Sequence, residues 1–240
     1  MKKNVVLYGN SNQGKSTLFG YLFVELNDVG GVEKFENYFK RELPKYNPAL
    51  LYTWIANKDY FLKKSTINEF TGEQEDRFVF NESGMSVDVF ERGMPIEVDG
   101  KREVFTFFDT PGQDQFHTQR DKGLEHGDIG VFCIEMGEIL KGAVDENHFR
   151  IYDIWPKISR KKPIIVLTKI DIDDHTSEED YLRACEILRK IGGYDESVRI
   201  VPTCVVAKEK RSANVLSKSD LTPWYSGPTL IEAIVEAAKK

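Results

Sequence analysis

The sequence predicts an α/β fold with a mainly parallel central sheet and helices on both of its faces. Short apolar runs alternate along the chain with amphipathic helical patterns, which is the order expected when helices connect parallel strands. The apolar runs are continuous, which indicates strands that are covered on both faces. A length of 240 residues suits one domain, and we expect residues 1–240 to form it.

The expected elements follow one another from the N-terminus. Buried strands are expected at residues 4–8, 104–108, 129–134, 164–167 and 199–201. Helices are expected at residues 18–26, 178–191 and 229–239. Thr176 and Ser177 are the cap candidates of the second helix, whose apolar side chains recur at three- and four-residue spacing. One face of that helix should therefore pack on the sheet.

Residues 27–83 interrupt the alternation, because no clear strand is expected there. Their apolar side chains recur at helical spacing on two faces. These are Val32, Phe35, Phe39 and Leu43 on one face, and Leu51, Trp54, Ile55 and Leu62 on the other. We therefore expect a helical insertion over residues 27–83. Residues 68–83 are polar and acidic, and we expect a mobile loop in that part.

Composition excludes several classes of protein. With 33 Lys and Arg against 39 Asp and Glu, the net charge of −6 gives no general attraction to nucleic-acid backbones. The 3 cysteines form no C-x-x-C pattern, so neither a disulfide framework nor a zinc site is expected. No run of about 18 apolar residues is present, so a membrane span is not expected. A reducing cytoplasm is the expected compartment.

A glycine-rich loop directly follows the first strand. Residues 9–17 read G-N-S-N-Q-G-K-S-T and satisfy G-x-x-x-x-G-K-[ST] in front of a helical stretch. Such a loop wraps phosphates with its backbone N–H groups, while Lys15 reaches the β- and γ-phosphates, Ser16 binds Mg²⁺ and Thr17 reaches the α-phosphate. The expected phosphate-binding residues are Asn12, Gln13, Gly14, Lys15, Ser16 and Thr17. A glycine-rich turn without a ligand is the alternative, and the strand–loop–helix context favours the P-loop NTPase fold.

A second motif ends the strand expected at residues 104–108. Asp109-Thr110-Pro111-Gly112 is a D-x-x-G sequence, in which the carboxylate can hold Mg²⁺ and the N–H of Gly112 can reach the γ-phosphate. Gln113 comes next and could orient the attacking water, since an amide is too weak a base to take its proton. The alternatives are an ordinary turn and a solvated glutamine on a mobile loop.

A third motif, Thr168-Lys169-Ile170-Asp171, follows the buried strand at residues 164–167. It resembles the [NT]-K-x-D element of guanine-nucleotide-binding proteins. The Asp171 carboxylate can accept hydrogen bonds from N1–H and N2–H₂ of guanine, whereas adenine offers an acceptor at N1. Lys169 would lay its aliphatic stem over the ring. Alone, the motif could instead be an aspartate that caps a turn.

In this order the motifs resemble a P-loop GTPase, and more specifically the G domain of the translation-factor group. That group includes elongation factor one-alpha and the GTPase subunit of sulfate adenylyltransferase. Residues 82–88, E-S-G-M-S-V-D, are similar to the E-R-G-I-T-I-D around the switch I threonine of the group. Residues 32–36 and 52–54 resemble its switch I helices, and residues 214–230 resemble the segment that leads into its last helix.

The chain also departs from the group in ways that affect the expected chemistry. Ser86 stands in place of the switch I threonine and is the third expected Mg²⁺ ligand, with Thr66 and Thr71 as competing candidates. Gln113 replaces a histidine and matches the small Ras-like GTPases instead. Cys204 and Val205 stand where the group has a Ser-Ala or Ser-Gly element that binds guanine O6; Cys204 could equally be a small buried hydrophobic residue.

Asn12 stands at a loop position where K⁺-dependent GTPases, such as the Era-like group, carry asparagine. By this resemblance its carbonyl oxygen would bind a K⁺ ion that supplies positive charge at the phosphates. Assistance by K⁺ is therefore a hypothesis beside the expected Mg²⁺ cofactor.

The resemblance implies a Mg²⁺-dependent GTPase that acts as a molecular switch. Gln113, Lys15 and Asn12 would act in the chemistry, and GTP, GDP and a protein effector or activator at the switches are the expected partners. One alternative is the G domain of an elongation factor that delivers aminoacyl-tRNA, and tRNA or ribosome contacts are expected only in that case. The other is a nucleotide-dependent protein-binding scaffold with little turnover. We favour a stand-alone GTPase.

Overall fold

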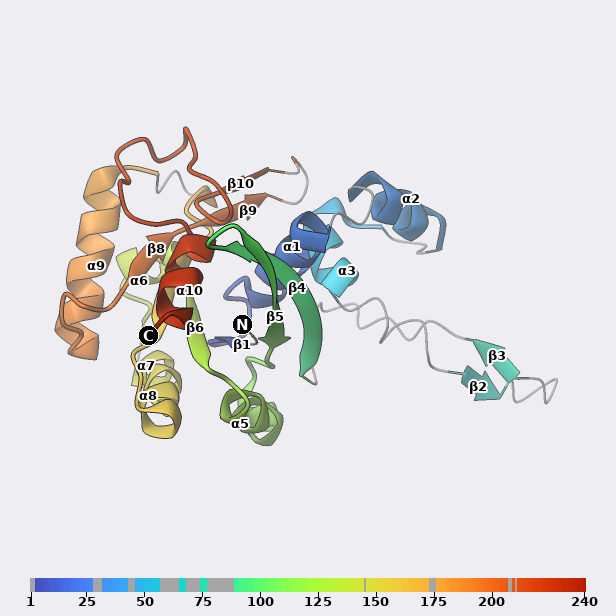
Figure 1. Ribbon diagram of the computed structural model, residues 1–240, viewed down its shortest axis with the longest axis horizontal. Helices are drawn as coiled ribbons and strands as arrows, with labels where there is room; N and C mark the ends of the chain where they lie inside the picture. Colours follow the sequence, from blue (N-terminus) through green and yellow to red (C-terminus); the bar gives the residue numbers. More distant parts are fainter. Residues whose placement is uncertain are drawn as a thin grey trace.

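The central sheet has six strands in the order β4-β5-β1-β6-β7-β8 (Figure 1). The computed structural model describes residues 3–27, 32–42, 46–56, 65–67, 74–76, 89–144, 146–172, 176–206, 209 and 211–240. The strands are β1 (Lys3–Tyr8), β4 (Phe90–Val98), β5 (Lys101–Asp109), β6 (Ile129–Glu135), β7 (Ile164–Thr168) and β8 (Ile200–Pro202). All neighbours pair in parallel except β4 and β5. The predicted α/β fold with a mainly parallel sheet is therefore confirmed.

Strand β4 was not expected from the sequence. It pairs antiparallel with β5 at the edge of the sheet, across a turn in which Asp99 and Gly100 both have positive φ angles, +51° and +74°. Gly93 and Pro95 interrupt its apolar pattern. Proline is tolerated in an edge strand because one side of that strand makes no ladder hydrogen bonds. The Asp-Gly pair is a hairpin signal that could have revealed the strand.

Helices cover both faces of the sheet because successive strand residues point in opposite directions. Val5 and Leu7 belong to the core that α1 and α10 cover and that continues into α2 and α3, whereas Val6 and Tyr8 belong to the core beneath α5 to α9 (Figure 1). On the first face, α1 (Lys15–Asn27) and α10 (Leu230–Ala238) lie against the sheet. Helix α3 (Leu51–Ala56) packs on the outer side of α1, and α2 (Val32–Glu42) packs against α3 (Figure 1). The helices of the second face are α5 (His117–Glu125), α6 (Met136–Leu140), α7 (Glu146–Tyr152), α8 (Ile154–Ser159) and α9 (Glu178–Gly192).

The three helices expected outside the insertion are confirmed as α1, α9 and α10. Of the two cap candidates, Ser177 is the N-cap of α9, and its side chain accepts a hydrogen bond from the Asp180 N–H at 3.1 Å. Thr229 and Glu232 form a capping box at the start of α10. These caps satisfy N–H groups that a helix leaves without internal partners.

Within the insertion at residues 27–83, α2 and α3 are helices, as expected. Phe39 of α2 and Trp54 of α3 are buried, and a 3₁₀ turn at Pro48–Leu50 precedes α3. Leu43, Leu62 and Thr71 lie outside the described residues. The expectation of no strand is wrong, because β2 (Ser65–Ile67) and β3 (Gln74–Asp76) pair antiparallel. Strands of three residues are too short to produce a recognisable alternation in the sequence.

Among the described residues, no helix is long and apolar enough to cross a membrane.

Candidate nucleotide-binding site

Two adjoining pockets lie where the parallel strands end. The larger pocket, of about 500 Å³, is lined by the loop after β1, by the loop after β5 and by the end of β6. The smaller pocket, of about 240 Å³, is lined by the loops after β7 and β8. Gly14, Thr17, Ala49 and Lys169 line both. Crevices at the carboxyl ends of parallel strands are the usual ligand sites of open α/β sheets.

The loop after β1 requires unusual backbone angles. Gly9 has φ +142°, and a Cβ atom built there would lie 2.3 Å from the carbonyl oxygen of Cys133 in β6. Gly14 has φ +77°, and Asn12 has φ +62° with an exposed side chain at the larger pocket. Glycine adopts such angles without a steric penalty, and asparagine tolerates them better than most residues. The loop can therefore turn tightly around a ligand before α1 begins.

Lys15 is buried in the larger pocket, with 5% of its surface exposed. Its ammonium donates a hydrogen bond to the carbonyl oxygen of Asn10 at 2.6 Å. Burial lowers the pKa of Lys15, although the nearby Asp109 carboxylate acts in the opposite direction. The side chain is therefore held inside the loop at a place where an anionic ligand would stabilise its charge.

Ser16 and Asp109 meet at the start of α1. The Ser16 hydroxyl donates to the Asp109 Oδ2 at 2.5 Å, and Asp109 is fully buried at the end of β5. Hydroxyl and carboxylate oxygens are ligands that Mg²⁺ prefers, so this pair fits the predicted metal. The third predicted ligand, Ser86, lies outside the described residues. Of its competitors, only the backbone of Thr66 is described, in β2.

The D-x-x-G segment lies against the loop after β1. Thr110 donates through its hydroxyl to the Leu7 carbonyl oxygen at 2.9 Å. A Cβ atom at Gly112 would lie 2.5 Å from the carbonyl carbon of Asn10 and 2.6 Å from the Lys15 ammonium. Gln113 lines the larger pocket, and its Oε1 accepts a hydrogen bond from Gln115 at 2.7 Å. Gly112 thus lies beside the Lys15 ammonium, and Gln113 lines the same pocket.

The third motif connects the two pockets. The Thr168 hydroxyl donates to the Gln13 carbonyl oxygen at 3.0 Å, and Lys169 has φ +57°. Asp171 lines the smaller pocket together with Cys204 and Val205 of β9 (Cys204–Val206), which pairs with β10 (Arg211–Ala213). Neither β9 nor β10 was expected. Burial and the Asp171 carboxylate raise the pKa of the Cys204 thiol to about 12, so the thiol stays neutral beside that carboxylate.

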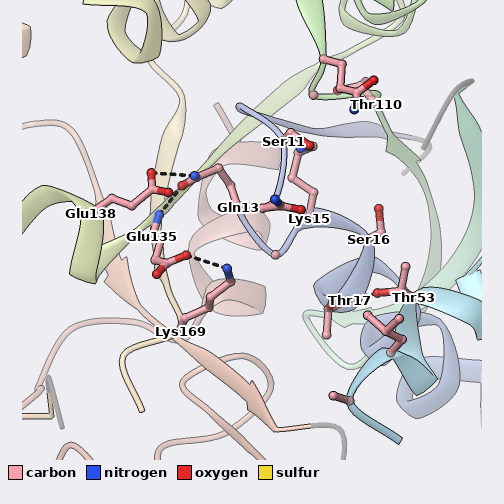
Figure 2. A pocket seen from close by; sticks show the side chains of 16 residues that line it. Ser11, Gln13, Lys15, Ser16, Thr17, Thr53, Thr110, Glu135, Glu138 and Lys169 are labelled. Carbon is pink, nitrogen blue, oxygen red and sulfur yellow. Dashed lines mark hydrogen bonds and ion pairs between the residues drawn. The ribbon is translucent and has the colours of Figure 1, made fainter. Parts of the chain in front are cut away.

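Two carboxylates of the site were not found from the sequence. Gln13 directs its side chain away from the loop: its Nε2 donates to Glu138 at 2.8 Å, and its Oε1 accepts from the Glu135 N–H at 2.5 Å (Figure 2). Glu135 also accepts from the Lys169 ammonium at 2.5 Å. A charged residue at the end of the apolar run 129–134 was the available signal for Glu135.

The insertion also contributes to the site, which was not expected. The Thr53 hydroxyl of α3 lies 2.9 Å from the Thr17 hydroxyl of α1, and Ala49 and Leu50 line the larger pocket (Figure 2). Gly20 permits this contact, since a Cβ atom there would lie 1.8 Å from the Tyr52 carbonyl oxygen. Glycine at this position lets α3 lie directly against α1.

The buried cysteines predict a loss of stability at alkaline pH. Burial raises the pKa of Cys133 and of Cys204 to about 12, from the ordinary value of 9.0. Between these values the unfolded thiols ionise and the folded ones do not, so the unfolded state is favoured as the pH rises above 9. We expect the free energy of unfolding in urea to fall between pH 9 and pH 10.5, by up to about 1.4 kcal/mol per pH unit for each thiol.

Cys133→Ala is the control for this prediction, because it should make the decline with pH shallower. An unchanged slope in that variant would contradict the assignment to buried thiols.

The chain matches the family model described as the elongation factor Tu GTP binding domain over residues 2–240. Among curated relatives, elongation factor 1-alpha of Ignicoccus hospitalis is 27% identical over 240 residues, covering 96% of the chain and 48% of the relative. Elongation factor 1-alpha 2 of Euplotes crassus is 27% identical over 239 residues, covering 97% and 48%. The chain therefore spans about half the length of these relatives.

Solved structures share the fold. The GTPase-like domain of S. cerevisiae Ski7 bound to GTP matches with a TM-score of 0.65 and 20% identity, over 100% of this chain and 51% of that one. Sup35 complexed with GMPPNP matches with a TM-score of 0.55 and 20% identity, over 98% and 44%.

Proposed function

Because the chain belongs to the elongation factor Tu GTP-binding domain family, we propose that it binds guanine nucleotides and hydrolyses GTP to GDP and phosphate. The observation that supports this proposal is the arrangement of the three motifs around two adjoining pockets. The larger pocket would hold the phosphates against Asn12, Gly14, Lys15 and the N–H of Gly112. The smaller pocket would hold the base between Lys169 and Asp171, with Val205 presenting its N–H.

Mg²⁺ is the cofactor that this proposal requires. Ser16 and Asp109 would hold it, and Ser86 would join them if the switch closes as in the family that the sequence resembles. When bound, the ion would neutralise charge on the β- and γ-phosphates. Lys15 would share that role from the other side of the loop, and Thr17 would donate to the α-phosphate. The hydrolysis itself would need Gln113 to orient a water at the γ-phosphate.

The first test is phosphate release from GTP by the purified chain in Mg²⁺ with either K⁺ or Na⁺, and ATP is the control nucleotide. In a single-turnover assay, Gln113→Ala should lower the hydrolysis rate about 10- to 100-fold and leave the dissociation constant of GDP unchanged. Gln119→Ala, at a glutamine of α5 that lines neither pocket, is the matched control and should hydrolyse GTP at the wild-type rate.

Three outcomes of this experiment separate the alternatives. GTP that binds without phosphate release would favour the protein-binding scaffold. An equal hydrolysis rate for Gln113→Ala and wild type would show that Gln113 takes no part in GTP hydrolysis. The proposed role of Asn12 as a K⁺ ligand is supported by its exposed side chain at the larger pocket. The same hydrolysis rate in Na⁺ and in K⁺ would contradict that role.

A role in translation is the second candidate function. It is favoured by the curated relatives named elongation factor 1-alpha, of which this chain matches 48% of the length. In that role the domain would serve in delivery of aminoacyl-tRNA, and tRNA and the ribosome would be partners. In either role we propose a cytoplasmic location and a protein effector or activator at the segments around the γ-phosphate. Retention of radiolabelled aminoacyl-tRNA by the GTP-bound protein, absent with GDP, is the discriminating measurement.

A further inference from the structure

A continuous chain of contacts joins the phosphate loop to the base-reading motif, and it passes through Glu135. The Gln13 side chain accepts from the Glu135 N–H at 2.5 Å, and the Glu135 carboxylate accepts from the Lys169 ammonium at 2.5 Å (Figure 2). These residues lie far apart in the sequence, since Glu135 and Lys169 are separated by 34 positions. The end of β6 thus links the loop after β1 to the loop after β7.

Lys169 needs such a partner to stay in place. Its side chain is long and flexible, and 30% of it is exposed at the boundary of the two pockets. A polyphosphate bound in the larger pocket would attract the ammonium toward the loop and draw the aliphatic stem away from the smaller pocket. The Glu135 side chain is 18% exposed, and its carboxylate accepts a hydrogen bond from the Lys169 ammonium at 2.5 Å, which can hold the ammonium against that attraction.

Glu138 provides the comparison within the same pocket. It also lines the larger pocket and carries the same charge, but it binds Gln13 at 2.8 Å and His148 at 3.2 Å. Removal of either carboxylate makes the pocket less negative by one charge. Only removal of Glu135 takes away the ion pair with Lys169.

We propose that Glu135 is a positioning residue for the base, which holds the Lys169 ammonium so that the lysine stem stays across the smaller pocket. The inference rests on the proposed binding of guanine nucleotides. It assigns to Glu135 no contact with the base and no part in hydrolysis. Base selection stays with Asp171, while the affinity for the ring depends on the Glu135–Lys169 pair.

The test compares Glu135→Ala with Glu138→Ala by fluorescence titration of a GDP analogue labelled on the ribose. Relative to Glu138→Ala, we expect Glu135→Ala to bind the GDP analogue about tenfold more weakly, because only this variant loses the ion pair with Lys169. The change in charge is the same in both variants, so it does not account for the difference. The ratio of GDP to IDP affinity should equal that of wild type, since Asp171 reads the 2-amino group. Glu135→Gln keeps the shape of the side chain and should give an intermediate loss if Glu135→Ala folds poorly.

A double-mutant cycle with Lys169→Met separates positioning from a general structural effect. If Glu135 acts through Lys169, Glu135→Ala should change the GDP affinity less than about twofold in the Lys169→Met background. An equal loss in both backgrounds, or equal affinities of the two alanine variants, would overturn the inference while leaving guanine-nucleotide binding intact. A wild-type protein that fails to bind the GDP analogue would instead refute the proposed function itself.

Discussion

Asp171→Asn should exchange the base that the protein binds. We expect the affinity for GDP to fall about a thousandfold, and the affinity for xanthosine diphosphate to rise to nearly the level of GDP in the wild type. The prediction depends on the hydrogen-bonding edge of the base. Guanine presents two donors, N1–H and N2–H₂, to which a carboxylate offers only acceptors. Asparagine would turn one acceptor into a donor and set it against the guanine amine.

Xanthine carries a carbonyl where guanine carries that amine. The asparagine amide could then donate to the carbonyl and accept from N1–H, so both hydrogen bonds would be restored. The structure favours a large effect, because only Lys169 and Asp171 are charged among the described residues that line the smaller pocket. The adjacent Cys204 thiol is held neutral by its raised pKa of about 12 and does not replace the lost carboxylate.

Competition titrations with GDP, IDP and xanthosine diphosphate measure the exchange directly. Asp153→Asn, at an exposed aspartate that lines neither pocket, is the matched control and should keep the wild-type preference for GDP. If Asp171→Asn loses GDP and gains no xanthosine diphosphate, the carboxylate supports the loop rather than reading the base. An unchanged affinity for GDP would place the base elsewhere.

The sequence predicts those parts of the fold that leave a recognisable pattern within one continuous stretch of residues. Strands such as 164–167 are buried on both faces, so their apolar runs are continuous and recognisable. Strand β4 lies at an edge, where Gly93 and Pro95 are tolerated and hide the pattern. The pair β2–β3 depends on contacts between strands of three residues, which leave no periodic signal.

The residues of the site also fall into two classes, those that stand in sequence motifs and those that tertiary packing brings to the site. Lys15, Ser16, Asp109 and Asp171 stand in motifs whose spacing is set by the loop geometry itself, and the structure brings these motifs together. The partners Thr53 and Glu138 are fixed by the packing of the tertiary structure instead. Thr53 meets a residue 36 positions away, and Glu138 meets one 125 positions away. One sequence without its fold contains no signal for such contacts.

Lys15→Met should abolish tight nucleotide binding and leave the fold at least as stable. Methionine keeps the length of the side chain but removes the charge and the three donors of the ammonium. A unit charge pair 4 Å apart contributes about 4 kcal/mol at an effective dielectric constant of 20, so we expect GDP and GTP affinities to fall on the order of a thousandfold. Fluorescence titration of the labelled GDP analogue measures the loss.

The two properties should separate because burial makes the charge of Lys15 unfavourable for folding. Burial lowers the pKa of Lys15 despite the attraction of Asp109. The ammonium form is therefore less favourable in the folded state than in the unfolded state. A neutral side chain removes this cost, so the free energy of unfolding in urea should stay equal or rise. Lys162→Met, at an exposed lysine that pairs with Asp195, should leave the affinity unchanged. A Lys15→Met protein that binds GDP as the wild type does would show that the loop after β1 is not the phosphate site. A Lys15→Met protein that binds GDP weakly because it is unfolded would contradict the expectation that the charge of Lys15 destabilises the fold.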